Sequence, residues 1–146
     1  CQSPVEEFVG NTYFTRLRVD FGDAQPTEVR RVLLCAGQMR WKLRLAILRR
    51  KLDYQVSVAS LEQLYPFPYE ELELYLRRYA AFQHVQYVWV QEEPQNQGAY
   101  HFVHSRLAQL LPDGHQLTCV CRGPSPTSAG GSFVHHQAEE ELLLDG

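Results

Sequence analysis

Short apolar runs alternate with helix-period segments along most of this chain, and this alternation limits the folds that it can adopt. Residues 32–36 (VLLCA) form a continuous apolar run, typical of a strand buried on both faces. Three further strand patterns cover residues 54–61, 85–90 and 116–121. There are four helical patterns: one follows Gly37, one begins at Pro68, one covers about 100 to 111 and one covers His135 to Leu144. Parallel neighbours need helical crossovers. The sequence therefore predicts a three-layer α/β domain with a mostly parallel sheet.

The helical segments also predict which of their faces pack against the sheet. After Gly37, apolar side chains recur at i, i+4, i+7 and i+11, which is the helix period. Pro68 suits the first turn of the second helix, where the glutamates that follow it stand at the positive end of the helix dipole. The expected buried stripes are Trp41, Leu45, Leu48 and Leu52 in the first helix and Leu72, Leu76 and Tyr79 in the second.

The chain of 146 residues has the length of one ordinary domain. Residues 1–28 are punctuated by proline and glycine, and only residues 12–14 (TYF) there have the composition of a strand. We therefore treat residues 1–28 as a lead-in or linker segment and residues 29–146 as the domain proper. A start on Cys1 and a single methionine, Met39, suit a segment of a longer protein.

Composition argues against several classes of function. The hydrophobic fraction of 45% and the charged fraction of 21% are those of a globular protein, and a net charge of −3 argues against nonspecific nucleic-acid binding. No apolar stretch reaches the ~20 residues of a membrane span, and the N-terminus has no signal-peptide pattern. Four irregularly placed cysteines do not make a disulfide scaffold. We expect a reducing, cytoplasmic location without nucleic-acid or membrane partners.

More than half of the chain's 14 Lys and Arg residues fall in or just before the first helix. They are Arg30, Arg31, Arg40, Lys42, Arg44, Arg49, Arg50 and Lys51. Such a cluster is either a patch for an anionic partner or a solvated helix face. Because the charges scatter around more than half of the helix circumference, the solvated face is favoured. Gly37 alone lacks the further glycines of a dinucleotide-binding turn.

Glu92 and Glu93 come directly after the strand pattern at 85–90, at the edge where open parallel sheets usually bind ligands. Adjacent carboxylates support acid–base chemistry when they face each other and one pKa is raised. Neighbours on an extended chain point to opposite sides, so a structural or interface role is favoured. Asn96, in the loop that follows, is a candidate cap for the next helix.

Thiols and imidazoles form two further candidate groups. Cys119 and Cys121 point to the same face of a strand, but no second cysteine pair follows at zinc spacing, so buried thiols are favoured. His101 and His104 share a helix face, yet the sequence nominates no third and fourth metal ligand. The residues alone therefore assign no catalytic, cofactor-binding or metal-binding site.

Several segments nevertheless share their order and spacing with one enzyme family. They are residues 60–68 (SLEQLYPFP), residues 88–99 (VWVQEEPQNQGA), and Arg122-Gly123-Pro124 leading to 128–131 (SAGG) and His136, with weaker agreement at 31–37 (RVLLCAG) and 5–8 (VEEF). Over essentially its whole length, the chain resembles the C-terminal domain of the thiamine-diphosphate-dependent, decarboxylating component of 2-oxoglutarate dehydrogenase, bacterial type. It departs from that family at Gln38, where a lysine is usual, and at Cys121, where a glycine is usual.

This resemblance implies a transketolase C-terminal-like domain with a sheet of about five strands and helices on both faces. It implies an enzyme of the tricarboxylic acid cycle that decarboxylates 2-oxoglutarate and succinylates the lipoyl group of a dihydrolipoyl succinyltransferase partner. In the family, thiamine diphosphate and magnesium are bound by the two preceding domains of a homodimer. The segment alone is therefore expected to be inactive and to bind neither cofactor.

The resemblance also nominates residues that contact other domains, a partner subunit or an anion. They are Glu92, Glu93, Asn96, Gly98, Arg122 and His136. One alternative is a stand-alone binding or regulatory module, in which Arg122, the glycine-rich loop and the basic helix would form an anion pocket. Another is a domain of a 2-oxoadipate-preferring relative.

Overall fold

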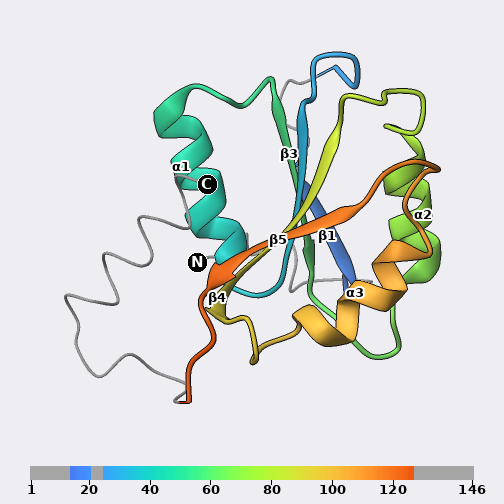
Figure 1. The fold of residues 1–146 in the computed structure, drawn as a ribbon. Coiled ribbons are helices and arrows are strands. Elements are labelled where there is room, and N and C mark those ends of the chain that lie inside the picture. Colours follow the sequence, from blue (N-terminus) through green and yellow to red (C-terminus); the bar gives the residue numbers. More distant parts are fainter. Residues whose placement is uncertain (1–13, 21–24, 127–146) are drawn as a thin grey trace.

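The computed structural model describes residues 14–20 and 25–126, which form one sheet covered by three helices (Figure 1). The strands are β1 (Leu17–Asp20), β2 (Arg31–Cys35), β3 (Val56–Leu61), β4 (Gln86–Pro94) and β5 (Leu117–Arg122), and the helices are α1 (Met39–Arg50), α2 (Tyr69–Arg77) and α3 (Tyr100–Ala108). Within these ranges, every helix is too short or too polar to cross a membrane.

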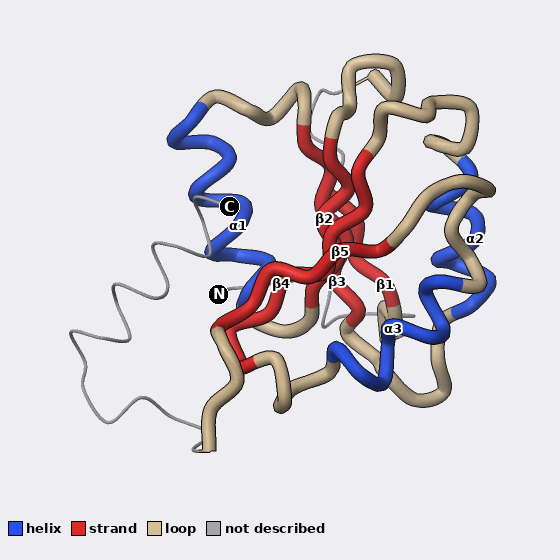
Figure 2. Tube along the Cα trace, viewed as in Figure 1, coloured by secondary structure: helices blue, strands red, loops and turns tan. Residues whose placement is uncertain are grey.

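The sheet has the strand order β1-β3-β2-β4-β5, and its strands cross the centre of the molecule (Figure 2). β2 pairs in parallel with both β3 and β4, and β4 pairs in parallel with β5. β1 pairs antiparallel with the outer side of β3. The predicted three-layer α/β architecture with a mostly parallel sheet of five strands is thereby confirmed.

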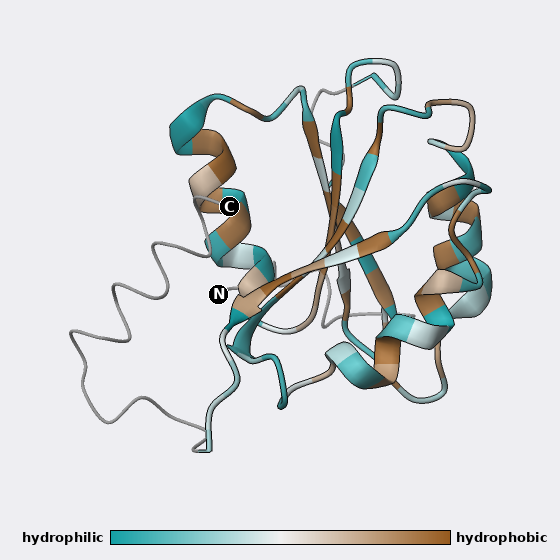
Figure 3. Cartoon of the chain, in the orientation of Figure 1, coloured by the Kyte–Doolittle hydropathy of each residue, from teal (hydrophilic) through white to brown (hydrophobic). Residues whose placement is uncertain are grey.

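Helices lie on both faces of the sheet, with α1 on one face and α2 and α3 on the other (Figure 1). The strands between them are largely apolar (Figure 3). The α2 and α3 side holds the larger core, whose largest fully buried side chains include Leu34, Leu72, Leu76, Tyr87, Trp89 and Leu107. The core under α1 consists of Cys35, Met39, Leu43, Ile47, Val58, Val88 and Val90. The alternation of side chains along the strands supplies both cores at once.

The predicted buried stripe is confirmed in α2 and wrong in α1. Leu72 and Leu76 of α2 are buried, as is Tyr79 just beyond the helix. In α1 the buried side chains are instead Met39, Leu43 and Ile47. The expected residues Trp41, Leu45 and Leu48 are exposed, and Leu52 is only partly buried. Both sets have helical spacing, so periodicity alone could not choose between them.

Two strands differ from the sequence-based expectation. β1 was not expected, because residues 17–20 (LRVD) are partly polar and lie inside the predicted lead-in segment. β4 continues to Pro94, so Glu92 and Glu93 lie within the strand rather than in the loop after it. The helix expected from His135 to Leu144 and residues 12–13 of the expected strand lie outside the described residues.

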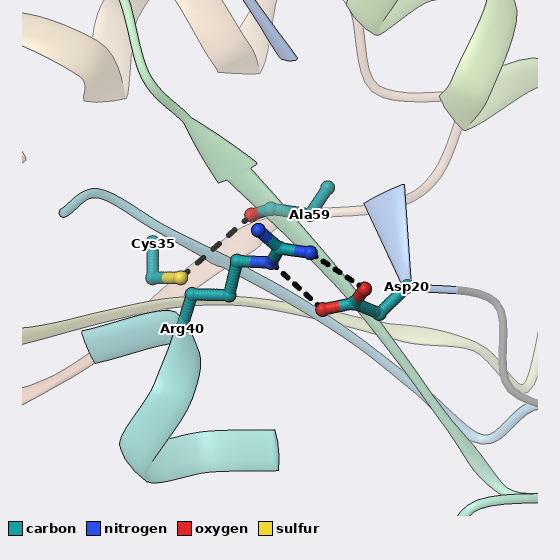
Figure 4. Close-up of polar contacts among 4 residues, drawn as sticks. All are labelled: Asp20, Cys35, Arg40 and Ala59. Atoms are coloured by element: carbon teal, nitrogen blue, oxygen red, sulfur yellow. Dashed lines mark hydrogen bonds and ion pairs between the residues drawn. The ribbon is translucent and has the colours of Figure 1, made fainter. Parts of the chain in front are cut away.

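An ion pair joins β1 to the first turn of α1 (Figure 4). Arg40 donates from Nε to Oδ2 of Asp20 and from Nη2 to Oδ1, each at 2.8 Å. The two side chains are only 12% and 22% exposed. The hydrogen bond from Arg40 lowers the pKa of Asp20 despite partial burial, and Asp20 raises the pKa of Arg40. Close by, the buried Cys35 thiol donates weakly to the carbonyl of Ala59 at 3.9 Å.

The Asp20–Arg40 pair predicts a pH-dependent loss of stability on Asp20→Asn. The pKa of Asp20 is lower in the folded protein than in the unfolded chain. The Asp20 carboxylate therefore stabilises the fold above the unfolded-state pKa of about 3.9, and this contribution is lost as the pH falls through the folded-state pKa. We expect the variant to lose about 1–2 kcal/mol of unfolding free energy at pH 7, a loss that shrinks below about pH 4. Urea unfolding across this pH range measures it.

The matched control is Glu73→Gln, which breaks the far more exposed ion pair with Arg77 on α2. Solvent screening makes such a pair worth little, so its removal should have almost no effect at any pH. Equal losses in the two variants would show that the Asp20–Arg40 pair is no stronger than an ordinary surface pair.

Candidate functional site

The carboxyl ends of β2 and β4 form the place where a sheet of this kind usually binds a ligand. The chain leaves β2 through α1 on one face to reach β3, and it reaches β4 through α2 on the other face. Adjacent strands whose connections run to opposite faces leave a crevice between them, called the switch point of the sheet. Here one side of the crevice is formed by Ala36 and Gly37, which follow β2, and the other side by the part of β4 that begins at Gln91.

The side-chain amide of Gln91 fills this crevice. Gln91 is only 3% exposed. Its Oε1 accepts hydrogen bonds from Trp89 Nε1 and from the backbone N–H of Tyr100, both at 3.0 Å. Its Nε2 donates to the carbonyl oxygens of Pro94 at 3.1 Å and Gln97 at 2.9 Å. Every lone pair and hydrogen of the amide is therefore used, which is what a buried amide requires.

Gly98 lets the turn after β4 close onto this amide. Its φ is +68°, a conformation that side chains with a Cβ rarely adopt. A Cβ at this position would lie 3.0 Å from both Gln91 Nε2 and Glu93 Cβ. The glycine that the sequence nominated as a contact residue thus serves the close packing of the turn on β4.

Glu92 and Glu93 do not form a facing pair of carboxylates. Glu92 accepts an ion-paired hydrogen bond from Lys42 Nζ of α1 at 2.7 Å. The backbone carbonyl of Glu92 accepts a hydrogen bond from Arg122 Nε at 2.9 Å. Glu93 is exposed to solvent. The arrangement ties β4 to α1 and β5, and it leaves Glu93 at the surface.

Asn96 does not cap α3, contrary to the prediction. The N-cap position belongs to Ala99, without a side-chain hydrogen bond. Asn96 instead exchanges two hydrogen bonds with the backbone of Ser125, at 2.9 Å and 3.0 Å, and Gln97 Nε2 donates to the same carbonyl at 3.1 Å. These contacts fasten the chain after β5 to the turn after β4.

Little space is left at the switch point. The cavity there has a volume of about 40 Å³ and is lined by residues that include Ala36, Trp89, Gln91 and Glu92. This volume holds one water molecule or a few, so thiamine diphosphate does not fit. A larger, open depression of about 420 Å³ lies at the other end of the sheet, and Glu28 is the carboxylate among its described lining residues. Among the described residues, no three His, Cys, Asp or Glu side chains come together as metal ligands do.

The remaining candidates are dispersed. His101 and His104 both pack their rings against Tyr100, at centroid distances of 5.5 Å and 5.3 Å. Of the basic cluster, Arg40 and Lys42 form ion pairs within the domain. His136 and the glycine-rich loop at 128–131 lie outside the described residues.

Sequence reasoning missed Gln91, the residue on which this site is built. The available signal was a lone glutamine directly after an apolar strand, with an indole two residues before it. Its other partners are backbone groups of a turn, and side chains alone do not reveal those.

A glycine-to-alanine series should separate backbone strain from packing at Gly98. Gly37 also has a positive φ, of +60°, but a Cβ there would meet nothing within 4 Å, and a Cβ on Gly123 would meet nothing either. We expect Gly98→Ala to cost about 2–4 kcal/mol, Gly37→Ala about 1–2 kcal/mol and Gly123→Ala less than about 0.5 kcal/mol. Chemical denaturation gives the three values, and equal costs at Gly98 and Gly37 would argue against the contact with Gln91.

Gln91→Glu tests the amide directly, because it keeps the shape and replaces the donor that faces two carbonyl oxygens. Burial should raise the pKa of the introduced carboxyl above its unfolded value of about 4.3. Stability is then greatest below that value and falls as pH rises through the folded pKa. We expect a loss of about 2–5 kcal/mol at pH 8 and a smaller one at pH 5, measured by urea unfolding.

Gln86→Glu, at the exposed start of the same strand, is the control and should change stability little at either pH. A pH-independent loss in Gln91→Glu would contradict the assignment of the amide as a buried donor.

Comparison with known proteins places these features in a family. The family model described as 2-oxoglutarate dehydrogenase C-terminal matches residues 2–146. The mitochondrial 2-oxoglutarate dehydrogenase of Caenorhabditis elegans is 34% identical over 147 residues, covering 98% of this chain and 14% of the relative. The 2-oxoglutarate dehydrogenase E1 component of Bacillus mycoides is 34% identical over 124 residues, covering 83% and 13%. That of Cupriavidus necator is 31% identical over 143 residues, covering 98% and 15%.

This chain thus spans only 13–15% of the length of these relatives. The match covers the segments that carry the resemblance, namely residues 60–68, 88–99, 122–124 and 128–131 and His136. The resemblance is confirmed, and the chain belongs to the 2-oxoglutarate dehydrogenase C-terminal family.

Proposed function

We propose that this chain acts as the C-terminal, non-catalytic part of a 2-oxoglutarate dehydrogenase, where it packs against the rest of the enzyme and supports its homodimer. The observation that carries the proposal is the outer face of α1. Trp41, Leu45 and Leu48 are 43%, 49% and 49% exposed and lie opposite the buried stripe of the same helix. Three large apolar side chains on one exposed helix face are typical of a surface that another part of a protein covers.

The occupant proposed for this face is the part of the enzyme that precedes this domain. The relatives extend far beyond the matched segment, so most of such an enzyme lies outside this chain. The filled switch point supports the same division of roles. A cavity of about 40 Å³ leaves no room here for a substrate or for thiamine diphosphate.

The whole enzyme, on this proposal, carries out the oxidative decarboxylation of 2-oxoglutarate in the cytoplasm as part of the tricarboxylic acid cycle. Thiamine diphosphate and magnesium would be held by the preceding domains, and the succinyl group would pass to the lipoyl group of a dihydrolipoyl succinyltransferase. The contribution of this domain is architectural. The lysine bound to Glu92, the arginine bound to its carbonyl and the buried Gln91 amide give it a rigid carboxyl edge.

The test places a charge on the outer face of α1, in both the isolated chain and the full-length enzyme. Leu45→Asp and Leu48→Asp should leave the unfolding free energy of the isolated chain within about 1 kcal/mol of the original, because both side chains are already half exposed. In the full-length enzyme we expect a weaker dimer, or one that dissociates at higher protein concentration. Sedimentation velocity measures that association.

Leu74→Asp on α2 is the matched control, since Leu74 is 73% exposed but stands outside the α1 face. It should leave the dimer intact. If the α1 variants behave like this control in the full-length enzyme, the outer face of α1 is not the docking surface and the proposal loses its main support.

A further inference from the structure

Two thiols stand on one side of β5, which pairs with β4 and is an edge strand among the strands that the structure describes. Cys119 and Cys121 are two residues apart in this strand, so their side chains point to the same face. Both are free cysteines, and both are partly rather than fully buried. Cys119 packs at the border of the core that lies beneath α2 and α3.

The surroundings keep both sulfurs close to each other and to one phenol. Partial burial, followed by the neighbouring thiol of Cys121, raises the pKa of Cys119 to about 12. Burial and then these same two thiols raise the pKa of Tyr100, at the start of α3. The Cys119 thiol is therefore protonated at neutral pH, and the Cys121 thiol is its hydrogen-bonding neighbour.

The spacing favours a bridging atom over a direct sulfur–sulfur bond. Two residues of extended strand span roughly 6.6 Å between Cα atoms, at the upper limit of the 4.4–6.8 Å that disulfides usually span. A single atom bound to both sulfurs separates them by roughly 3.3–3.8 Å when each bond is about 2.3 Å and the angle between the bonds is about 90–109°, a range that includes the pyramidal geometry of trivalent arsenic. A zinc ion would need four ligands, and the described residues bring no third His, Cys, Asp or Glu to this pair.

We infer that Cys119 and Cys121 form a bidentate dithiol site for a trivalent arsenic centre, carried by a monosubstituted arsenical of the type R–As=O. In the reaction two S–H bonds break and two As–S bonds form. The oxygen leaves as water with both thiol protons, and arsenic stays in the +3 state, so no oxidant or reductant takes part. One chain takes up one arsenical.

This site lies at the end of β5, in the residues just before the carboxyl edge of the sheet. Occupation would cross-link the end of β5 immediately before Arg122, the residue that holds the carbonyl of Glu92. A bound arsenical would thus act on the carboxyl edge of the sheet, away from the outer face of α1.

The test uses phenylarsine oxide as the probe on the complete 146-residue chain, followed by native mass spectrometry. We expect one adduct per chain, with the mass of the arsenical less one water. It should survive an excess of glutathione, a monothiol that cannot replace a two-bond chelate, and should be removed by 1,2-ethanedithiol. Cys119→Ser and Cys121→Gly should each lower the retained adduct at least tenfold.

Cys35→Ala is the control, because Cys35 lies under α1 on the opposite face of the sheet, and it should retain the adduct fully. Circular dichroism of each variant shows that it is folded, and Cys121→Gly provides a second, independent test should Cys119→Ser fail to fold. Retention of the adduct by Cys121→Gly, or its loss from the unaltered chain in glutathione, would overturn the inference.

Discussion

The buried amide of Gln91 is the contact on which the carboxyl edge of this domain depends. It joins the indole of Trp89 in the core, the first backbone N–H of α3, the carbonyl of Pro94 at the end of β4 and the carbonyl of Gln97 in the turn after it. Removing it would leave several buried polar groups unpaired, each at a cost of about 1–3 kcal/mol. The same turn holds the backbone of Ser125 through two hydrogen bonds with the side chain of Asn96. A single side chain therefore organises the ends of β4 and β5 and the start of α3.

The layers of the fold follow from sequence because apolar periodicity reports burial. Continuous apolar runs gave the parallel strands, and α2 has one clear apolar stripe, so its buried face was predicted correctly. α1 has two apolar stripes on opposite faces, one ending at Ile47 and the other at Leu48. Periodicity cannot rank two such stripes, since both satisfy the same 3.6-residue rule. The second stripe stays exposed on the surface of the domain.

The site was harder to predict because its partners are distant in sequence. Local rules treat the polar residues after Val90 as a loop, although hydrogen bonding to β5 continues the strand to Pro94. Local rules also make Asn96 a cap, whereas its partner is 29 residues away. The edge strand β1 has a weak pattern, and its position depends on pairing with β3 and on the Asp20–Arg40 ion pair. Long-range polar contacts of this kind leave no periodic signal in the sequence.

A filled switch point changes where such a domain can meet other molecules. In an open α/β sheet the crevice between oppositely connected strands is the usual entry for a ligand, but here the chain's own Gln91 occupies it with every hydrogen bond satisfied. Displacing that amide would leave its buried hydrogen-bonding partners unpaired, at a cost of about 1–3 kcal/mol each. Among the described residues, the outer face of α1 gathers an exposed tryptophan and two exposed leucines on one helix, so burying it would contribute hydrophobic free energy without rearranging the core.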